Sequence, residues 1–352
     1  MSSTLEVLLV CAEDADITPA MRQSACWKYG LFIGMLEILL LTAPARCQQQ
    51  ASPTPPASGA DAKAYVEFGI ANGAKGDLNA AIAAFNQAIS IDPKYAPAYF
   101  NLGLAYSFEH KPDEAISEYG RAIQIDPRYR DAFYNRACLR GEKGDFDGAL
   151  GDFGEVIKLD PKYAPAYYNE AHAHYFKGDL DGALGELDQA VNLDPNSAVY
   201  YFIRGLIQHA QGHREEALSD FQKSSSMTFP DAAFWVWITE TESGQRDLAR
   251  QSLSDALSSP VRFKPDKWPS QIGNFLLEKI TQDQLILKAG TGADAGSKMR
   301  LCQAWFYSAM FKGLAGDRKG AQDCFLKAIA TGSTGSEAFV EANRQVAELQ
   351  KQ

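Results

Sequence analysis

The sequence has few of the residues that most often carry catalysis or metal binding. Its 352 residues include five histidines, and we find no glycine-rich phosphate loop and no serine–histidine–aspartate setting for a nucleophile. His172 and His174 lie two residues apart, so on a helix they face different sides. His209 and His213 have i, i+4 spacing but no evident third ligand. We therefore expect no catalytic residue, no metal site and no cofactor.

Positive charge and cysteine are also scarce. Asp and Glu outnumber Lys and Arg by 44 to 34, which gives a net charge of −10, and no basic stripe interrupts this excess. Nucleic acid and anionic membrane surfaces are therefore not expected as partners. Six cysteines in a chain of this length exclude a disulfide-stapled fold. Cys302 and Cys324 lie out of step on two predicted helices, which disfavours a disulfide between them.

Residues 21–45 have the order of a secretory signal peptide. Arg22 and Lys28 form a positive start, an apolar run follows from Tyr29 to Leu41, and a small-residue site closes the segment. The run is too short, and with Glu37 too polar, for a good transmembrane helix. Residues 1–20 contain acids but no Lys or Arg, so we interpret them as an N-terminal extension.

Three alternatives remain for the N-terminus. The segment is cleaved after Ala45, is kept as an anchor, or is lipidated at Cys47, although Pro44 and Arg46 fit a lipidation site poorly. Each alternative places the folded part outside the cytoplasm, in the periplasm or cell envelope. Membrane contact is then expected only through such an anchor. Residues 46–61 are rich in Gln, Ser, Pro and Ala, and they predict a disordered linker.

A short phrase recurs at fixed spacing from Asp92 to Phe229. It begins with Asp-Pro, and its prolines stand at 93, 127, 161 and 195, always 34 residues apart. The residue before a proline avoids the α region, so each Asp-Pro ends a helix. Pro97 and Pro165 would sit in the first turn of the next helix, where no N–H is needed. A fixed period of 34 predicts stacked helical hairpins.

Small and large residues follow the same period. We number each unit from Ala62, Ala96, Arg130, Ala164 and Ala198. Two helices approach closely only where side chains are small, and a larger group would overpack the crossing by about 1–3 kcal/mol. Positions 8 and 20 are small throughout: Gly69, Gly103, Ala137, Ala171 and Gly205, then Ala81, Ala115, Ala149, Ala183 and Ala217. Position 24 is a large knob expected to fill the space between units: Phe85, Tyr119, Phe153, Leu187 and Phe221. Position 15, the turn, is Gly76, His110, Gly144, Gly178 and Gly212.

These residues resemble the tetratricopeptide repeat family, with five consecutive units over 62–229. The resemblance implies an all-α fold, a right-handed superhelix of about six to seven stacked hairpins, and a concave groove lined by the first helices. It also implies a protein or peptide partner instead of small-molecule chemistry. In such a groove, positions 2, 5, 9, 12 and 13 of the first helix face inward.

The C-terminal third continues the pattern less regularly. Residues 230–258 predict a degenerate sixth unit, 259–299 a helical connector, and 300–352 a seventh unit with a capping helix from Glu337 to Gln350. Within the connector we expect a helix over 271–279, a capping box at Thr281–Gln284 and a loop over 290–296. The C-terminal third, roughly residues 230–350, resembles the NlpI-type tetratricopeptide lipoproteins, through the phrase from Trp268 to Leu285 followed by a hairpin and the helix that begins at Glu337. That resemblance implies an adaptor for envelope peptidoglycan hydrolases and a processing protease.

Positions 5 and 6 predict the partner-binding groove. The aromatic residues at position 5 form a ladder, and the asparagines at position 6 offer amides to a peptide backbone. The predicted groove residues are Phe100, Asn101, Tyr134, Asn135, Tyr168, Asn169 and Phe202. The alternative is that both positions only serve packing. A cationic clamp for a C-terminal carboxylate is not expected, because position 2 holds Pro97 and Asp131.

Two functional hypotheses follow. The first is a non-catalytic, exported scaffold or adaptor that binds a protein or peptide in this groove, and a homo-oligomer is left open. The second is an enzyme or enzyme subunit whose chemistry lies in the 259–299 insert. That insert contains Lys264, Asp266, Lys267 and Glu278 but no His or Cys, which disfavours the second hypothesis.

Overall fold

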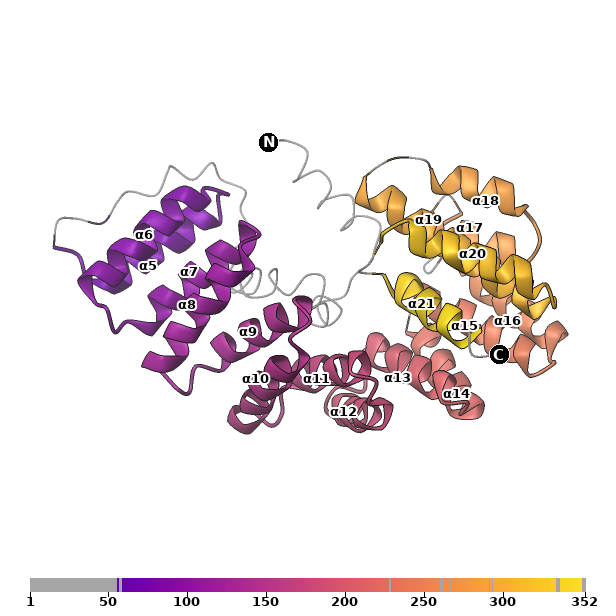
Figure 1. Ribbon diagram of the computed structural model, residues 1–352, viewed down its shortest axis with the longest axis horizontal. Helices are drawn as coiled ribbons and strands as arrows, with labels where there is room; N and C mark the ends of the chain where they lie inside the picture. The colour runs from indigo at the N-terminus through magenta and orange to yellow at the C-terminus, as the bar shows by residue number, and fades with distance from the viewer. Residues whose placement is uncertain are drawn as a thin grey trace. The chain divides into compact units, whose positions relative to one another are not determined.

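The protein is an array of helical hairpins. The computed structural model (Figure 1) describes residues 56, 59–227, 229–259, 263–265, 267–290, 292, 294–333 and 336–349. All regular secondary structure within these ranges is α-helical, as the sequence predicts. The chain divides after Pro195 into two compact units. The predicted extension, the signal peptide or anchor, Cys47 and most of the linker lie outside the described residues.

The first unit contains four hairpins. Each first helix packs against its own second helix, and each second helix packs against the first helix of the next hairpin. Contacts also join α5 to α7 and α9 to α11, so the first helices share one side of the stack. The helices are α5 Ala62–Gly73, α6 Leu78–Ile91, α7 Ala96–Phe108, α8 Pro112–Ile125, α9 Arg130–Glu142, α10 Phe146–Leu159, α11 Ala164–Phe176 and α12 Leu180–Leu193. All four first helices begin at position 1 of a predicted unit.

Local signals set the helix ends. The turn glycines take left-handed backbone conformations, with φ of 82° at Gly76 and 80° at Gly144, and His110 adopts the same region at 57°. In three hairpins of the first unit the aspartate after the turn glycine, Asp77, Asp145 or Asp179, caps the second helix; Asp145 Oδ1 accepts from the Gly148 N–H at 3.0 Å. Each second helix ends one residue before an Asp-Pro, as at Leu159 before Asp160.

Position 24 packs against position 8 of its own hairpin. A Cβ added at Gly69 would lie 2.4 Å from the Phe85 ring, and one added at Gly103 would lie 2.7 Å from the Tyr119 ring. These distances are far inside van der Waals contact, so only glycine fits beneath the rings. The sequence predicted that position 24 fills the space between neighbouring repeats. The structure shows that the ring also sits in the crossing of its own two helices.

The second unit contains the remaining helices: α13 Ala198–Ala210, α14 Arg214–Ser226, α15 Pro230–Glu242, α16 Arg246–Leu257, α17 Trp268–Leu276, α18 Gln282–Ala289, α19 Ala295–Leu314, α20 Arg318–Ala330 and α21 Glu337–Leu349. The capping box of α18 is present, with Thr281 Oγ1 accepting from the Gln284 N–H at 3.3 Å and Gln284 Oε1 accepting from the Thr281 N–H at 2.9 Å. Cys302 and Cys324 are buried and unbridged.

Helix boundaries in the C-terminal third differ from the sequence prediction. The helix expected over 271–279 spans Trp268–Leu276; it begins earlier because Pro269 is accepted in its first turn. The loop expected over 290–296 is shorter, since α19 begins at Ala295. Asp294 caps α19 by accepting from the Ser297 N–H at 2.8 Å.

Aromatic side chains of α19 cover α15. Trp237 stacks on Phe311 at 6.1 Å and 3°, and Phe234 meets Tyr307 edge-on at 5.2 Å. The last helix, α21, packs on α19 and α20 through small buried residues such as Ala342. The predicted seventh hairpin, α19 and α20, therefore closes the apolar side of the sixth hairpin, α15 and α16.

Candidate partner-binding site

The predicted aromatic ladder lies in the packing of the first unit. Phe100 contacts Tyr119 at 5.7 Å and Tyr129 at 5.0 Å, so it packs against position 24 and against the tyrosine that precedes the next unit. Tyr134 repeats this arrangement with Phe153 at 5.9 Å and Tyr163 at 5.4 Å. The ladder side chains are almost fully buried, with 5–6% exposed from Val66 to Tyr168.

The predicted asparagines bond to their own helices. The Nδ2 groups of Asn101, Asn135 and Asn169 each donate at 2.8 Å to the backbone carbonyl four residues earlier. Asn169 also donates to the Tyr134 hydroxyl at 3.0 Å. The side chains are at most 8% exposed. The three amides therefore bond within their own helices, and Asn169 also links α11 to α9.

Phe202, in the second unit, is buried against rings of its own and the next hairpin. Its ring packs against Phe221 at 5.9 Å and Phe229 at 4.7 Å, and 1% of it is exposed. It shares a small depression with Phe306 of α19 and Ala338 of α21. The geometry thus favours the packing alternative for positions 5 and 6, and a contribution of these residues to partner binding stays a prediction.

A second group of aromatic residues lies further along the inner side of α11. The Tyr168 and His172 rings meet edge-on at 4.7 Å, and Tyr175 meets Phe176 edge-on at 5.6 Å. Phe176 also stacks on Phe146, the first residue of α10, at 5.5 Å and 4°, and 42% of Phe176 is exposed. We call these five residues, Phe146, Tyr168, His172, Tyr175 and Phe176, the α11 aromatic surface.

The sequence contains a pattern that indicates this surface, but the groove prediction used only positions 5 and 6. His172, Tyr175 and Phe176 stand at positions 9, 12 and 13 of the fourth unit, all inward-facing positions of the family. Among the four hairpins of the first compact unit, only the fourth has aromatic residues at all three of these positions. The earlier hairpins read Ile70, Gly73, Ala74; Leu104, Ser107, Phe108; and Cys138, Gly141, Glu142.

The α11 aromatic surface carries no charge near neutral pH. Burial lowers the pKa of His172 to about 4, so its imidazole stays neutral. The neighbouring cations are paired: Lys177 with Asp147, and Lys143 with Asp113. The surface is therefore aromatic and uncharged, unlike the cationic clamp that would hold a carboxylate.

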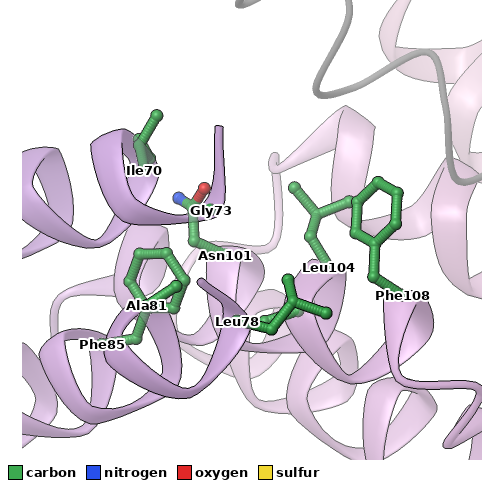
Figure 2. A pocket seen from close by; sticks show the side chains of 9 residues that line it. Ile70, Gly73, Leu78, Ala81, Phe85, Asn101, Leu104 and Phe108 are labelled. Carbon is green, nitrogen blue, oxygen red and sulfur yellow. The ribbon is translucent and has the colours of Figure 1, made fainter. Parts of the chain in front are cut away.

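An apolar pocket extends the same side of the stack toward the first hairpins (Figure 2). It is lined by Ile70 of α5, Phe85 of α6, Leu104 of α7 and further small or apolar residues, with the Asn101 amide as its polar side chain. Leu78 and Phe108 also line the pocket; they stand at position 17 of the first repeat and position 13 of the second. Phe146 and Phe176 stand at position 17 of the third repeat and position 13 of the fourth. The same pair of positions is therefore apolar in both places.

A third feature distinguishes the fourth hairpin. In the third and fifth hairpins, positions 7 and 23 form bidentate ion pairs, Arg136 with Asp152 and Arg204 with Asp220, at 2.7–2.8 Å. The fourth hairpin has Glu170 and Glu186 at these positions. Burial and, second, the charge of Glu186 raise the pKa of Glu170 to about 7.

This pair predicts a pH-dependent stability. Because the folded pKa of Glu170 is above the unfolded value of about 4.3, the folded state retains a proton that the unfolded state has released. The melting temperature should therefore fall as pH rises from about 5 to 8. Glu170→Arg, which rebuilds the pair of the neighbouring hairpins, should reduce this fall and raise the melting temperature at pH 8 by a few degrees.

Controls separate this effect from other carboxylates. Partial desolvation also raises the pKa of Glu142 to about 7. Part of the decrease in melting temperature between pH 5 and 8 should therefore persist in the Glu170→Arg variant. Glu155→Gln, at an exposed glutamate paired with Lys158, should leave the profile unchanged. A wild-type melting temperature that is flat from pH 5 to 8, or a Glu170→Arg protein less stable at pH 8, would contradict the assignment.

Among the described residues, no three His, Cys, Asp or Glu side chains come together in a way that would hold a metal ion. His209 bonds to Glu242 at 2.8 Å and contacts the Trp235 ring. In the described part of the 259–299 insert, Glu278 pairs with Arg250 and the Lys264 carbonyl accepts from Ser270. None of the described helices combines the length and apolar character needed to cross a bilayer.

Stacked hairpins with a 34-residue period define a helical-repeat protein. Proteins of this class generally bind other proteins. Models of the tetratricopeptide repeat match residues 74–107, 96–129 and 142–204. The chain is a tetratricopeptide repeat protein.

Solved structures share the fold. A tetratricopeptide repeat protein from Parabacteroides merdae is 16% identical, covers 81% of this chain and 97% of its own, and has a TM-score of 0.53. MamA from Desulfovibrio magneticus RS-1 is 19% identical over 49% of this chain and 97% of its own, at 0.46. YrrB, described as having an unusual peptide-binding site, is 23% identical over 47% of this chain and 86% of its own, at 0.44. The likeness to the Parabacteroides merdae protein, at 16% identity, shows the fold alone. No curated protein sequence matches the chain significantly.

Proposed function

We propose that the protein is a non-catalytic scaffold that binds a protein or peptide partner through the α11 aromatic surface. The observation that carries this proposal is the cluster of five aromatic side chains, four on α11 and Phe146 at the start of α10, in which Phe176 is 42% exposed. Aromatic side chains supply large contact areas and dominate binding energy at protein interfaces.

The proposal includes export to the periplasm or cell envelope. The positive start, apolar run and small-residue site of residues 21–45 support it, whether the segment is cleaved, lipidated at Cys47 or kept as an anchor. The partner class implied by the NlpI-type resemblance is an envelope peptidoglycan hydrolase or protease. A scaffold acts on such an enzyme by raising the effective concentration of the proteins that it holds together.

The test is affinity purification from envelope extract, followed by titration of the recovered partner. Tyr175→Ala with Phe176→Ala should weaken partner binding by about 30-fold or more, as loss of an aromatic hot spot does. Ile91→Ala is the matched control, because Ile91 on α6 is also 42% exposed but lies away from the surface. The control should bind as wild type does.

Unchanged affinity in the double variant would contradict the assignment of the site. The enzyme alternative is tested separately with the purified protein alone. If that protein turns over peptidoglycan or a peptide substrate, the scaffold proposal is wrong.

A further inference from the structure

The charge of the C-terminal third differs from that of the rest of the chain. Residues 259–330 contain eleven Lys and Arg residues against six Asp and Glu residues, whereas the whole chain has a net charge of −10. Such an asymmetry is a feature of chains that bind a partner of opposite charge. Because charges spread evenly over a surface select no partner, what matters is where the cations gather.

Cations gather where the sixth and seventh hairpins turn. Arg246, the first residue of α16, donates to the Leu314 carbonyl at the end of α19 at 3.3 Å. The turn after Leu314 leads directly into Arg318 and Lys319, the first two residues of α20. All three cations are exposed. We call Arg246, Arg318 and Lys319 the basic turn edge.

The acids near this edge do not neutralise it. Asp317 lies 3.6 Å from Lys312, so its charge is shared with a further cation. Asp247, the second residue of α16, offsets one of the three cations. Among the described residues, no acid forms an ion pair with Arg318 or Lys319. The basic turn edge therefore keeps a positive charge that its own hairpins leave uncompensated.

Helix stability does not explain these cations. The N-terminus of a helix carries a partial positive charge, so an acid in the first turn is favourable and a cation is unfavourable. The first turn of α20 contains no acid, and its second residue is Lys319. In the first unit the second residue of α8, α10 and α12 is an aspartate: Asp113, Asp147 and Asp181. The basic turn edge thus reverses the charge of the earlier turns, although the reversal is unfavourable for the helix that carries it.

The acids of the first unit form a complementary edge. Asp113 pairs with Lys143 of the next hairpin, and Asp147 pairs with Lys177, so consecutive turns lie side by side. The two aspartate side chains are nevertheless 75% and 84% exposed. An ionised carboxylate has about four acceptor sites, so one lysine leaves room for a further cation. We call Asp113, the exposed Glu114 and Asp147 the acidic turn edge.

We propose that the basic turn edge of one copy binds the acidic turn edge of a second copy. Each edge carries its charges on two neighbouring turns, so more than one pair of opposite charges meets in the contact. Arginine suits it, because a planar guanidinium donates to a carboxylate at two points. The contact joins unlike surfaces, so it repeats from copy to copy. It goes beyond the scaffold function, since it needs no ligand at the α11 aromatic surface.

The net charge of −10 opposes association only at long range. At physiological ionic strength the Debye length is about 8 Å, so charges further apart than this repel one another little. Opposite charges in contact across the two edges are screened least. We therefore expect an association that rises with concentration and weakens at high salt.

The experiment uses the full chain and two charge-reversal variants. One carries Arg318→Glu and Lys319→Glu, and the other carries Asp113→Lys and Glu114→Lys. In about 0.15 M salt the wild-type mass from analytical ultracentrifugation should rise with concentration, and in about 1 M salt, where the Debye length is about 3 Å, it should return to that of a monomer. Each variant alone should stay monomeric, because like charges then face each other. A mixture of the two variants should associate again.

Folding and specificity are controlled at the same time. All four substituted residues are exposed, and glutamate at the first two positions of α20 is favoured by the helix dipole. Both variants should therefore unfold near the wild-type melting temperature. Lys158→Glu is the matched control, because Lys158 is 72% exposed and lies on neither edge. This variant should associate as wild type does.

Three results would overturn the proposal: a wild type that stays monomeric at all concentrations in about 0.15 M salt, a reversal variant that associates as wild type does, or a mixture that does not associate. Association that strengthens at high salt would also overturn it, since an apolar contact would then hold the copies together. If wild type is monomeric but loses an acidic envelope protein on Arg318→Glu substitution, the basic turn edge serves another partner and self-recognition is wrong. The scaffold proposal has its own test at the α11 aromatic surface, so none of these results decides it.

Discussion

Truncation after Ser258 is expected to make the protein aggregate. Deleting residues 259–352 removes α19, whose rings cover Phe234, Trp235 and Trp237 of α15. These three side chains are at most 5% exposed in the intact unit. Each aromatic side chain buries about 150–250 Å², so their uncovering adds an apolar patch on the order of 500 Å², larger than most soluble monomers expose. Light scattering after size exclusion measures the outcome.

A shorter truncation is the matched control. Deleting residues 331–352 removes α21, whose buried contacts are mainly small side chains such as Ala338 and Ala342. This chain should remain soluble and monomeric when dilute, with a lower melting temperature, because α19 still covers α15. The account of the C-terminal cap fails if the chain truncated after Ser258 is also soluble, monomeric and as stable as wild type.

Asp152→Ala is expected to destabilise the first unit by about 3 kcal/mol. The Asp152 side chain is 5% exposed and accepts three charge-assisted hydrogen bonds, two from Arg136 at 2.7 and 2.8 Å and one from Arg140 at 2.8 Å. Removing one partner of a buried pair leaves the other charge uncompensated, which costs about 3–5 kcal/mol. We expect the lower figure, because Arg136 and Arg140 are 16% and 28% exposed and regain some hydration.

Asp147→Ala provides the comparison. Asp147 pairs with Lys177 between the third and fourth hairpins, but its side chain is 84% exposed. Exposed ion pairs contribute about 0–1 kcal/mol, so this variant should unfold at nearly the wild-type denaturant midpoint. Chemical denaturation of both variants measures the difference. Equal effects would show that the buried aspartate does not hold the third hairpin together.

The sequence predicted the repeat architecture because its signals are local. The turn at Gly144, the cap at Asp145 and the stop at Asp160-Pro161 each act within a few residues, so the period alone places the helix ends. Gly103 beneath Tyr119 is likewise a contact within one hairpin. Such features need no knowledge of distant segments.

The burial of the ladder could not be predicted in the same way. The period assigns Phe100 and Tyr134 to the inner side, but it does not say which neighbours cover them; Tyr129 and Tyr163 do so from the connecting turns. Phe202 lines a depression together with Phe306 of α19 and Ala338 of α21, which are about a hundred residues or more away in sequence, and no local signal predicts this arrangement. The α11 aromatic surface was within reach of the sequence, because positions 9, 12 and 13 can be read directly.

The most direct test of the central claim places a photoreactive phenylalanine analogue at position 176 and, in a second protein, at position 91. Both sites are 42% exposed, but only position 176 belongs to the α11 aromatic surface. Irradiation in envelope extract should crosslink a partner protein from position 176 and none from position 91. Crosslinking of the same partner from position 91, with none from position 176, would contradict the claim that α11 forms the binding site.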